Sequence, residues 1–230
     1  MCTRYVAPEE REIEAVWHIG GRNLPHWDRN VFPRSKGVYI RRARDDAEYS
    51  KELVVGQWGL IPWFAKEAKL KYSTSNARSE ELSEKASYKE PWARGQRCII
   101  PASTFDEPNW ETGKNIWWKF ARKDGLPWGL AGLWSIWTDK STGEIYDSYT
   151  MLTLNADAHP IMSRMHKPDP KLAADKQDKR SVISIEPEHV DLWLTGTIDE
   201  VEPLLRAPAM EILDAYPEGY SRGSDELLLP

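Results

Sequence analysis

Short apolar runs rich in β-branched and aromatic residues recur along the chain, and residues that favour turns separate them. Runs of this length and composition, bounded by Gly, Pro, Asn, Asp or Ser, are typical of strands. We therefore predict strands at Leu53–Val55, Arg97–Ile100, Asn115–Phe120, Trp128–Trp137, Ser148–Leu154 and Val182–Ile185.

Other segments space their apolar residues about three to four positions apart, which is the period of an amphipathic helix. The clearest is Pro8–Trp17, where Pro8 and the acidic residues that follow it suit a first helical turn. By the same spacing we predict helices at Phe64–Leu70, Ser79–Ala86, Pro187–Leu194, Ile198–Leu205 and Ala209–Tyr216.

The two kinds of element are mixed without a regular strand–helix–strand alternation, which argues against a parallel sheet. We predict an α+β fold with a curved, largely antiparallel, barrel-like sheet and peripheral helices. No internal repeat and no Gly/Ser linker divides the sequence. We therefore expect a single domain over residues 1–230, with an irregular tail from about residue 218.

Composition narrows the class of protein. The chain is 40% hydrophobic and 29% charged, which is typical of a globular protein, and its net charge is −5. A polyanion site on such a chain must be local. No apolar run approaches the roughly 18 residues of a membrane helix, and no targeting segment is evident, so we expect a cytoplasmic protein with no membrane partner.

The two cysteines, Cys2 and Cys98, are too few for a disulfide framework, and we expect free thiols. Cys98 lies in an apolar run, where an inert core position is expected. The chain also holds 12 tryptophans. Most should be core residues, and the exceptions are candidates for stacking on bases, because every base presents a π-face to an aromatic ring.

Four stretches concentrate reactive polar residues in apolar surroundings. They are Met1–Tyr5, Ser75–Glu80, Thr104–Glu107 and His159–Pro168. Together with neighbouring motifs they form an ordered series of blocks: Cys2-x-Arg4-Tyr5, Asn30–Pro33, Trp58–Pro62, Asn76–Glu80, Cys98–Ala102 leading into Glu107, and Arg164-Met165. In order and spacing this series resembles the SOS response-associated peptidase (SRAP) family, also described as abasic-site processing or DNA–protein crosslink proteins.

The chemistry of the first block can be argued from its residues. Removal of Met1 would leave Cys2 with a free α-amine beside its thiol, two nucleophiles with reference pKa values of about 8 and 8.5. An aldehyde reacts with such a pair first at the amine, as an imine, and the thiol then closes a thiazolidine ring. The ring-opened sugar of an abasic site is an aldehyde.

The resemblance implies that this reaction is the function. It implies a stable covalent link between Cys2 and an abasic site, preferably in single-stranded DNA, which shields the lesion in the DNA damage response. It also implies a crosslinking or lyase-type enzyme without a cofactor or an obligate protein partner, associated with the nucleoid when bound to damaged DNA.

The matched motifs imply supporting roles. Glu107 would be the general acid/base, and Asn76 would hold the N-terminal residue or a sugar hydroxyl. The positive charges for phosphate binding would come from Arg4, Arg78 and Arg164. The residues that would line the DNA cleft or stack on bases are Pro33, Trp58 and Phe64.

The sequence departs from the family pattern at one catalytic position. The family usually carries a histidine two residues before the Arg-Met pair, where this chain has Met162. We expect His166 to supply the imidazole, with His159 as the second choice. Asp106 and Pro108 also replace the aromatic neighbours common around the glutamate.

Other interpretations remain open. Asn76 could be a helix N-cap, Arg164 a partner in a surface ion pair, and Glu107 a turn carboxylate. The arginines at positions 41, 42 and 44 are followed by Asp45, Asp46 and Glu48, which indicates a self-compensating solvated face.

Two other function classes also remain. One is a cysteine peptidase that uses Cys2 as an N-terminal nucleophile, including self-processing. The other is a noncovalent binding module or a metal site from Cys2, Cys98, His159 and His166, whose spacing fits no standard zinc pattern.

Overall fold

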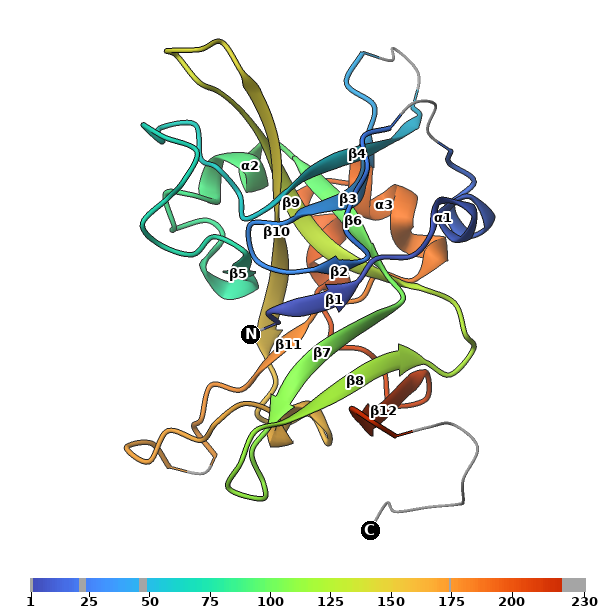
Figure 1. The fold of residues 1–230 in the computed structure, drawn as a ribbon, viewed down its shortest axis with the longest axis vertical. Coiled ribbons are helices and arrows are strands. Elements are labelled where there is room, and N and C mark those ends of the chain that lie inside the picture. Colours follow the sequence, from blue (N-terminus) through green and yellow to red (C-terminus); the bar gives the residue numbers. More distant parts are fainter. Residues whose placement is uncertain (1, 21–23, 46–48, 174, 221–230) are drawn as a thin grey trace.

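The fold is built around a closed barrel, as a computed structural model that describes residues 2–20, 24–45, 49–173 and 175–220 shows. The barrel strands pair in the order β10-β4-β3-β6-β9, and β9 pairs again with β10 to close the ring. Their bounds are β3 Lys36–Arg42, β4 Lys51–Trp58, β6 Arg97–Ala102, β9 Trp128–Thr138 and β10 Ile145–Asn155 (Figure 1). Two short strands, β5 (Asn76–Arg78) and β11 (Arg180–Val182), also pair with β10.

A second, open sheet lies beside the barrel in the lower part of Figure 1. Its order is β12-β8-β7-β1-β2. The bounds are β1 Arg4–Val6, β2 Asn30–Val31, β7 Thr104–Asn109, β8 Ile116–Arg122 and β12 Leu213–Pro217. Only Ser103 separates β6 from β7, so the chain passes directly from the barrel into this sheet. The N-terminal strand β1 therefore lies where the two sheets meet.

The helices are short and peripheral (Figure 1). They are α1 Glu10–Trp17, α2 Lys89–Ala93, α3 Val190–Thr195 and α4 Ile198–Val201, with single 3-10 turns at Ser79–Glu81, Met162–Arg164, Pro187–His189 and Glu202–Leu204. Helix α1 begins with a capping box in which Glu9 and Glu12 bond each other's backbone N–H groups. The predicted α+β class, with a curved barrel-like sheet and peripheral helices, is confirmed.

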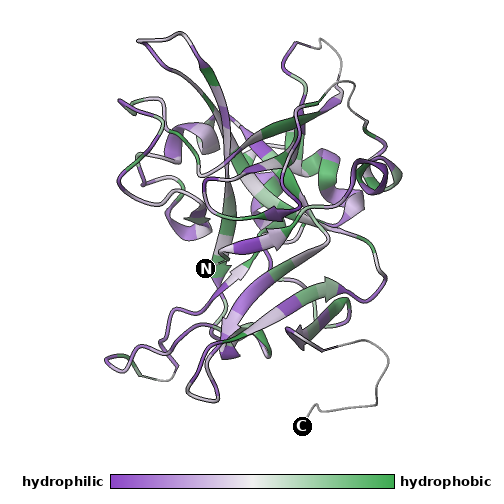
Figure 2. Ribbon diagram, viewed as in Figure 1, coloured by the Kyte–Doolittle hydropathy of each residue, from purple (hydrophilic) through white to green (hydrophobic). Residues whose placement is uncertain are grey.

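Large aromatic side chains fill the core. Trp58, Trp128 and Trp193 are fully buried, and each indole N–H donates to a backbone carbonyl, at 2.7, 3.1 and 2.9 Å respectively. A buried indole needs such a partner, because its N–H otherwise loses its bond to water. Figure 2 shows apolar residues following the barrel strands and polar residues on the outer loops. Cys98 is buried in this core, as expected.

Most predicted strands are confirmed, and so are three of the predicted helices, at Pro8–Trp17, Pro187–Leu194 and Ile198–Leu205. Two predicted helices are wrong. Phe64–Leu70 is irregular, since Trp63 and Phe64 point outward and leave no apolar face to bury. Ala209–Tyr216 instead leads into strand β12, because pairing with β8 overrides the helical spacing.

Two further predictions need adjustment. Within Ser79–Ala86 one 3-10 turn forms in place of a helix, and β11 ends at Val182 in place of spanning Val182–Ile185. The predicted tail falls largely on residues 221–230, which lie outside the described residues, and the single-domain boundary stays a prediction.

Candidate active site

Cys2 lies at the junction of the two sheets because β1 is clamped between β7 and β2. Arg4 is in register with Asp106, and Tyr5 pairs with both Phe105 and Val31. The Cys2 side chain is fully buried. Its thiol donates to the carbonyl oxygen of Arg4 at 3.3 Å and contacts that of Asp106 at 3.9 Å.

This environment controls the ionisation of the thiol. Burial raises the pKa of Cys2 well above its ordinary value, and the negative charge of Glu107 raises it further. Desolvation and a nearby carboxylate both disfavour a thiolate. The thiol of Cys2 is therefore held protonated at neutral pH.

Asn76 holds the backbone of Cys2 through a hydrogen bond to its carbonyl oxygen. It lies on β5, which pairs in parallel with β10, and its side-chain amide donates to the carbonyl oxygen of Cys2 at 2.8 Å. The N-cap interpretation is wrong, because Asn76 is in a strand and the backbone of Arg78 begins the following 3-10 turn. Side chains project from the faces of a sheet, and that of Asn76 reaches the residue just before β1.

Glu107 and His166 form a hydrogen-bonded pair beside Cys2. Glu107 is 1% exposed, and its Oε2 lies 2.8 Å from Nε2 of His166. The backbone of His166 has a φ of 63°, its N–H donates to the carbonyl of Pro108 at 2.6 Å, and its own carbonyl accepts from Lys179 at 2.7 Å. The imidazole is thus aimed at Glu107 by bonds to its own main chain.

His159, the second choice, lies away from this group. Its Nδ1 accepts the N–H groups of Ile161 and Met162 at 3.2 and 3.0 Å, and its Nε2 donates to the carbonyl of Pro208 at 3.0 Å. Nδ1 therefore holds the turn at Met162–Arg164, and Nε2 ties His159 to the segment at Pro208. Met162 itself is fully buried in the core.

Arg4, predicted to contact phosphate, is bound to two carboxylates. Its guanidinium pairs with the buried Asp106 and, at 2.6 Å, with Glu218, while it lies 5.5 Å from the ring centroid of Trp117. Burial raises the pKa of Asp106, while Arg4 and Lys119 oppose that rise. The pair braces β1 against β7 two residues from Cys2.

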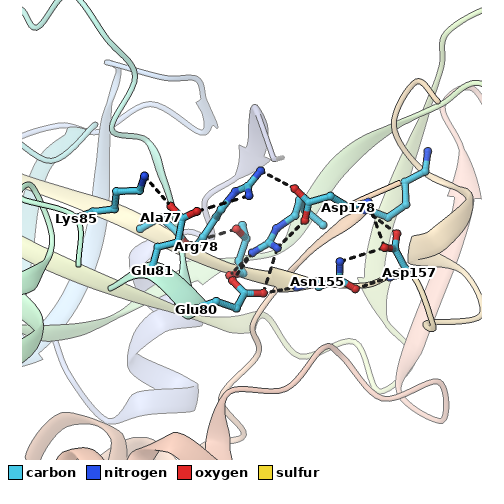
Figure 3. A network of polar contacts seen from close by, with 11 residues as sticks. Ala77, Arg78, Glu80, Glu81, Lys85, Asn155, Asp157 and Asp178 are labelled. Atoms are coloured by element: carbon cyan, nitrogen blue, oxygen red, sulfur yellow. Dashed lines mark hydrogen bonds and ion pairs between the residues drawn. The ribbon is translucent and has the colours of Figure 1, made fainter. Parts of the chain in front are cut away.

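Arg78 and Arg164 also hold carboxylates, but at more exposed positions. Arg78 lies 2.5 Å from Asp178 and 3.7 Å from Glu81, in the network of Figure 3. Arg164 makes two bonds to Glu111, at 2.8 and 2.9 Å, as a surface ion-pair partner would. Their side chains are 43% and 31% exposed, so solvent or a ligand can reach both.

The prediction that Trp58 lines the DNA cleft or stacks on a base is wrong. Trp58 is fully buried beneath β1, with its ring 5.2 Å from that of Tyr5, so no base can stack on it. Phe64 is 41% exposed and packs edge-on against Trp63, which is 67% exposed. Trp63 was not among the predicted site residues, although its place beside Phe64 in a lysine-rich loop was a usable signal.

Two cavities are lined by residues that the sequence predicted for the site, one by Pro33 and one by His166. Pro33 is exposed and lines a cavity of about 260 Å³ together with Arg34, Tyr72 and Ser75. A cavity of about 520 Å³ opens beside His166 and is lined by Trp110, Glu111, Arg164, Lys179 and their neighbours. His166 is itself one of the residues that line this second cavity.

Within the described part of the chain, no group of three or more His, Cys, Asp or Glu residues is arranged to hold a metal ion. The same residues include no helix long and apolar enough to cross a membrane.

Comparisons with known proteins bear on this arrangement. The model of the SOS response associated peptidase (SRAP) family matches residues 1–218. The "Abasic site processing protein HMCES" of Xenopus tropicalis is 29% identical over 183 residues, which is 64% of this chain and 53% of that protein. The "Abasic site processing protein YoqW" of Bacillus subtilis (strain 168) is 30% identical over 161 residues, covering 70% and 66% of the two chains.

The chain therefore spans between about half and two thirds of these curated relatives. Among solved structures, a Bordetella bronchiseptica protein is 32% identical with a TM-score of 0.83, covering 95% of this chain and 100% of that one. A Bacteroides thetaiotaomicron protein, 22% identical with a TM-score of 0.75, covers 94% and 91% and shares the fold.

Proposed function

The chain belongs to the SOS response associated peptidase family, and we propose that it processes abasic sites in single-stranded DNA by covalent attachment of Cys2 to the lesion. The observation that carries this proposal is the convergence of four polar groups from different segments. The backbone and thiol of Cys2, the amide of Asn76 and the Glu107–His166 pair meet where the two sheets join. The proposal requires that Cys2 is the first residue of the mature chain.

The reaction we propose is a condensation of an aldehyde with an aminothiol. The amine of Cys2 attacks C1′ of the ring-opened sugar, and a C–N bond forms. Loss of water gives an imine, and the sulfur of Cys2 then adds to the imine carbon while the thiol proton passes to nitrogen. The product is a thiazolidine, and one water is released.

The ionisation of Cys2 supports this order of steps. Because burial and Glu107 raise the pKa of the thiol, the amine is the better nucleophile for the first attack. The thiol still carries the proton that the ring nitrogen needs after sulfur adds. The proposed sequence therefore uses the thiol as the second nucleophile.

Proton transfer falls to Glu107 and His166. Glu107 would take up the proton that the amine loses as the C–N bond forms and would give it to the departing hydroxyl of the carbinolamine, while the imidazole 2.8 Å away would exchange a proton with the carboxylate. Asn76 would hold the Cys2 carbonyl still while these steps occur.

Binding of the DNA would use exposed groups around the junction. Arg78 and Arg164 are accessible cations, and the exposed rings of Trp63 and Phe64 offer stacking faces to unpaired bases. Pro33 would line the path of the strand. Arg4 would act chiefly by bracing β1, since Asp106 and Glu218 already neutralise it.

The test is to incubate the protein with a single-stranded oligonucleotide that carries one abasic site and to look for an adduct on a denaturing gel. We expect an adduct with wild type and with Cys98→Ala, whose thiol is buried elsewhere in the core. Cys2→Ala should give none. An adduct of equal yield from Cys2→Ala would refute the proposal.

Peptidase activity, which the family description also suggests, is less favoured by the site. A cysteine peptidase attacks with a thiolate, and the pKa of Cys2 is raised by burial. Cleavage of a peptide library by wild type but not by Cys2→Ala would establish it.

A further inference from the structure

A further cavity, lined by arginines, lies away from Cys2. It has a volume of about 470 Å³ and sits between the end of β3, the end of α2 and the segment that joins α3 to α4. Its lining includes Arg42, Arg44, Arg94, Arg97, Trp134 and Gly196, and none of its lining residues is acidic. Four arginines around one cavity make a local positive cluster on a chain of net charge −5.

The cavity lies at the far end of β3 from the N-terminal strand. The first residue of β3, Lys36, pairs with Gln57 beside Trp58, on which Tyr5 packs. Arg42 is the last residue of β3. Seven strand residues rise by about 20 Å, so the cavity is separate from the Cys2 site.

Arg97 forms a rigid floor to this cavity. It is 3% exposed, its Nε donates to the carbonyl of Trp193 at 2.5 Å, and its Nη2 donates to that of Gly196. In the described residues it has no carboxylate partner, and burial lowers its pKa with no acidic group opposing that effect. A buried cation without a counter-charge is costly, and an anion in the cavity would offset that cost.

The other arginines supply accessible charge at the rim. Arg42 and Arg44 are exposed, and neither forms an ion pair with any residue that the structure describes. Arg94 is 68% exposed and pairs with Glu90 of its own helix at 2.5 Å. From the sequence we expected Asp45, Asp46 and Glu48 to neutralise this face. Asp45 makes no such pair, and residues 46–48 lie outside the described residues.

We propose that this cavity binds the phosphate groups of a nucleic-acid strand, as a contact separate from the site at Cys2. Guanidinium groups bind phosphate oxygens through paired N–H donors. The four cations come from two stretches of chain, 42–44 and 94–97, and each phosphate of a strand that they neutralise adds to the affinity. The inference rests on the proposed function in so far as the protein acts on DNA.

The test uses a lesion-free single-stranded oligonucleotide of about 20 nucleotides and protein carrying Cys2→Ala, so that no adduct forms. Fluorescence anisotropy gives Kd as a function of salt. We expect Arg42→Gln/Arg44→Gln to raise Kd several-fold and to lower the slope of log K against log salt by about 1.4, because each phosphate contact on a single strand contributes about 0.7.

A matched control removes the same charge elsewhere. Arg11→Gln/Lys140→Gln changes exposed residues on α1 and in the β9–β10 turn, and it should leave Kd close to wild type. Arg94→Gln, on a different element of the cavity, should also weaken binding. Thermal unfolding of each variant confirms that its fold is intact.

The outcomes separate this inference from the proposed function. Equal Kd and salt slope for Arg42→Gln/Arg44→Gln and wild type would overturn the second contact, whatever the adduct assay shows. The second contact would also be overturned if the substitutions weaken the binding of AMP and leave the binding of the oligonucleotide unchanged, because that result would indicate a free-nucleotide site. If Kd and its salt slope depend on Arg42 and Arg44 as expected but wild type forms no adduct at Cys2, the covalent reaction would be contradicted and the second contact would stand.

Discussion

Cys2 owes its chemical character to residues from two separate strands, β5 and β7. Asn76 of β5 holds its carbonyl, β7 supplies the Asp106 carbonyl that contacts its thiol, and Glu107 lies near enough to raise its pKa. Each of these residues is ordinary by itself, and none would mark a site without the others. The reactivity proposed for Cys2 therefore depends on its coupling to Glu107.

The substitution Glu107→Gln tests that coupling. Removal of the negative charge takes away one cause of the raised thiol pKa, so iodoacetamide should alkylate Cys2 with a midpoint at lower pH than in wild type. Adduct formation should slow by about 10²-fold or more through loss of the acid/base. Both proteins would carry Cys98→Ala, so that one thiol is observed. A midpoint that stays in place or rises would contradict the coupling.

The two histidines should separate by function. His166→Ala should slow adduct formation by about 10²-fold with a small effect on stability, since the imidazole serves Glu107. His159→Ala should cost about 1 kcal/mol of unfolding free energy, because it removes the acceptor for two N–H groups, and its folded fraction should react at the wild-type rate. Single-turnover adduct rates and urea denaturation measure the two effects. The reverse pattern would transfer the imidazole role to His159.

Among the secondary-structure elements, strand β1 determines where Cys2 lies. The Tyr5 hydroxyl meets that of Tyr149 on β10 at 2.5 Å, which joins β1 to the barrel. Gly37 of β3 lies directly against both hydroxyls. A side chain at position 37 would occupy their space, so the glycine lets the two sheets approach.

Gly37→Ala should therefore destabilise the protein by about 1–3 kcal/mol through overpacking, measured by urea denaturation. The new Cβ would collide with the hydroxyls of Tyr5 and Tyr149. Tyr149→Phe removes one of those oxygens. Gly37→Ala should therefore cost less unfolding free energy when it is added to Tyr149→Phe than when it is added to wild type. A Gly37→Ala protein as stable as wild type would show that β1 is not fixed in this way.

Sequence patterns predicted strands that are mainly apolar and missed several that are partly polar. β6, β9 and β10 are runs of buried apolar residues, and their composition alone indicates strands. By contrast, β1, β5 and β7 are three to six residues long and partly polar, and they exist because neighbouring strands complete their hydrogen bonds. These three strands position Cys2, Asn76 and Glu107.

The site residues were predicted by motif, and the structure adds which of them lie together. His166 follows the Arg164-Met165 pair, and its left-handed backbone turns the ring back to Glu107, a reversal that no spacing indicates. The sequence alone does not show which of Trp58 and Trp63 is buried and which is exposed. Burial beneath β1 separates them, and that depends on tertiary packing.

At the scale of the whole protein, the arginines near the Cys2 site differ from those at the distant end of β3 in whether a carboxylate pairs with them. Arg4, Arg78 and Arg164 each hold a carboxylate near the Cys2 site, whereas the distant Arg42 and Arg44 have no such partner in the described residues. Exposed ion pairs contribute about 0–1 kcal/mol, so a phosphate can displace a carboxylate at little cost.

Glu111→Gln tests this competition. It removes the carboxylate that holds Arg164, so the affinity for a lesion-free single strand should rise several-fold at low salt, as measured by anisotropy. Glu188→Gln removes the same charge at an exposed position outside both DNA-binding regions and should change Kd less. Weaker binding by Glu111→Gln would instead assign Glu111 a positioning role for Arg164.

The proposed reaction consumes both the amine and the thiol of Cys2 with one abasic aldehyde. Intact and tandem mass spectrometry of the adduct can detect both bonds. We predict a protein without Met1, joined to the oligonucleotide with loss of one water, and with the attachment on Cys2 resistant to both borohydride and thiol alkylation. An adduct that retains Met1, lies on another residue, or leaves the Cys2 thiol free to alkylate would contradict this reaction.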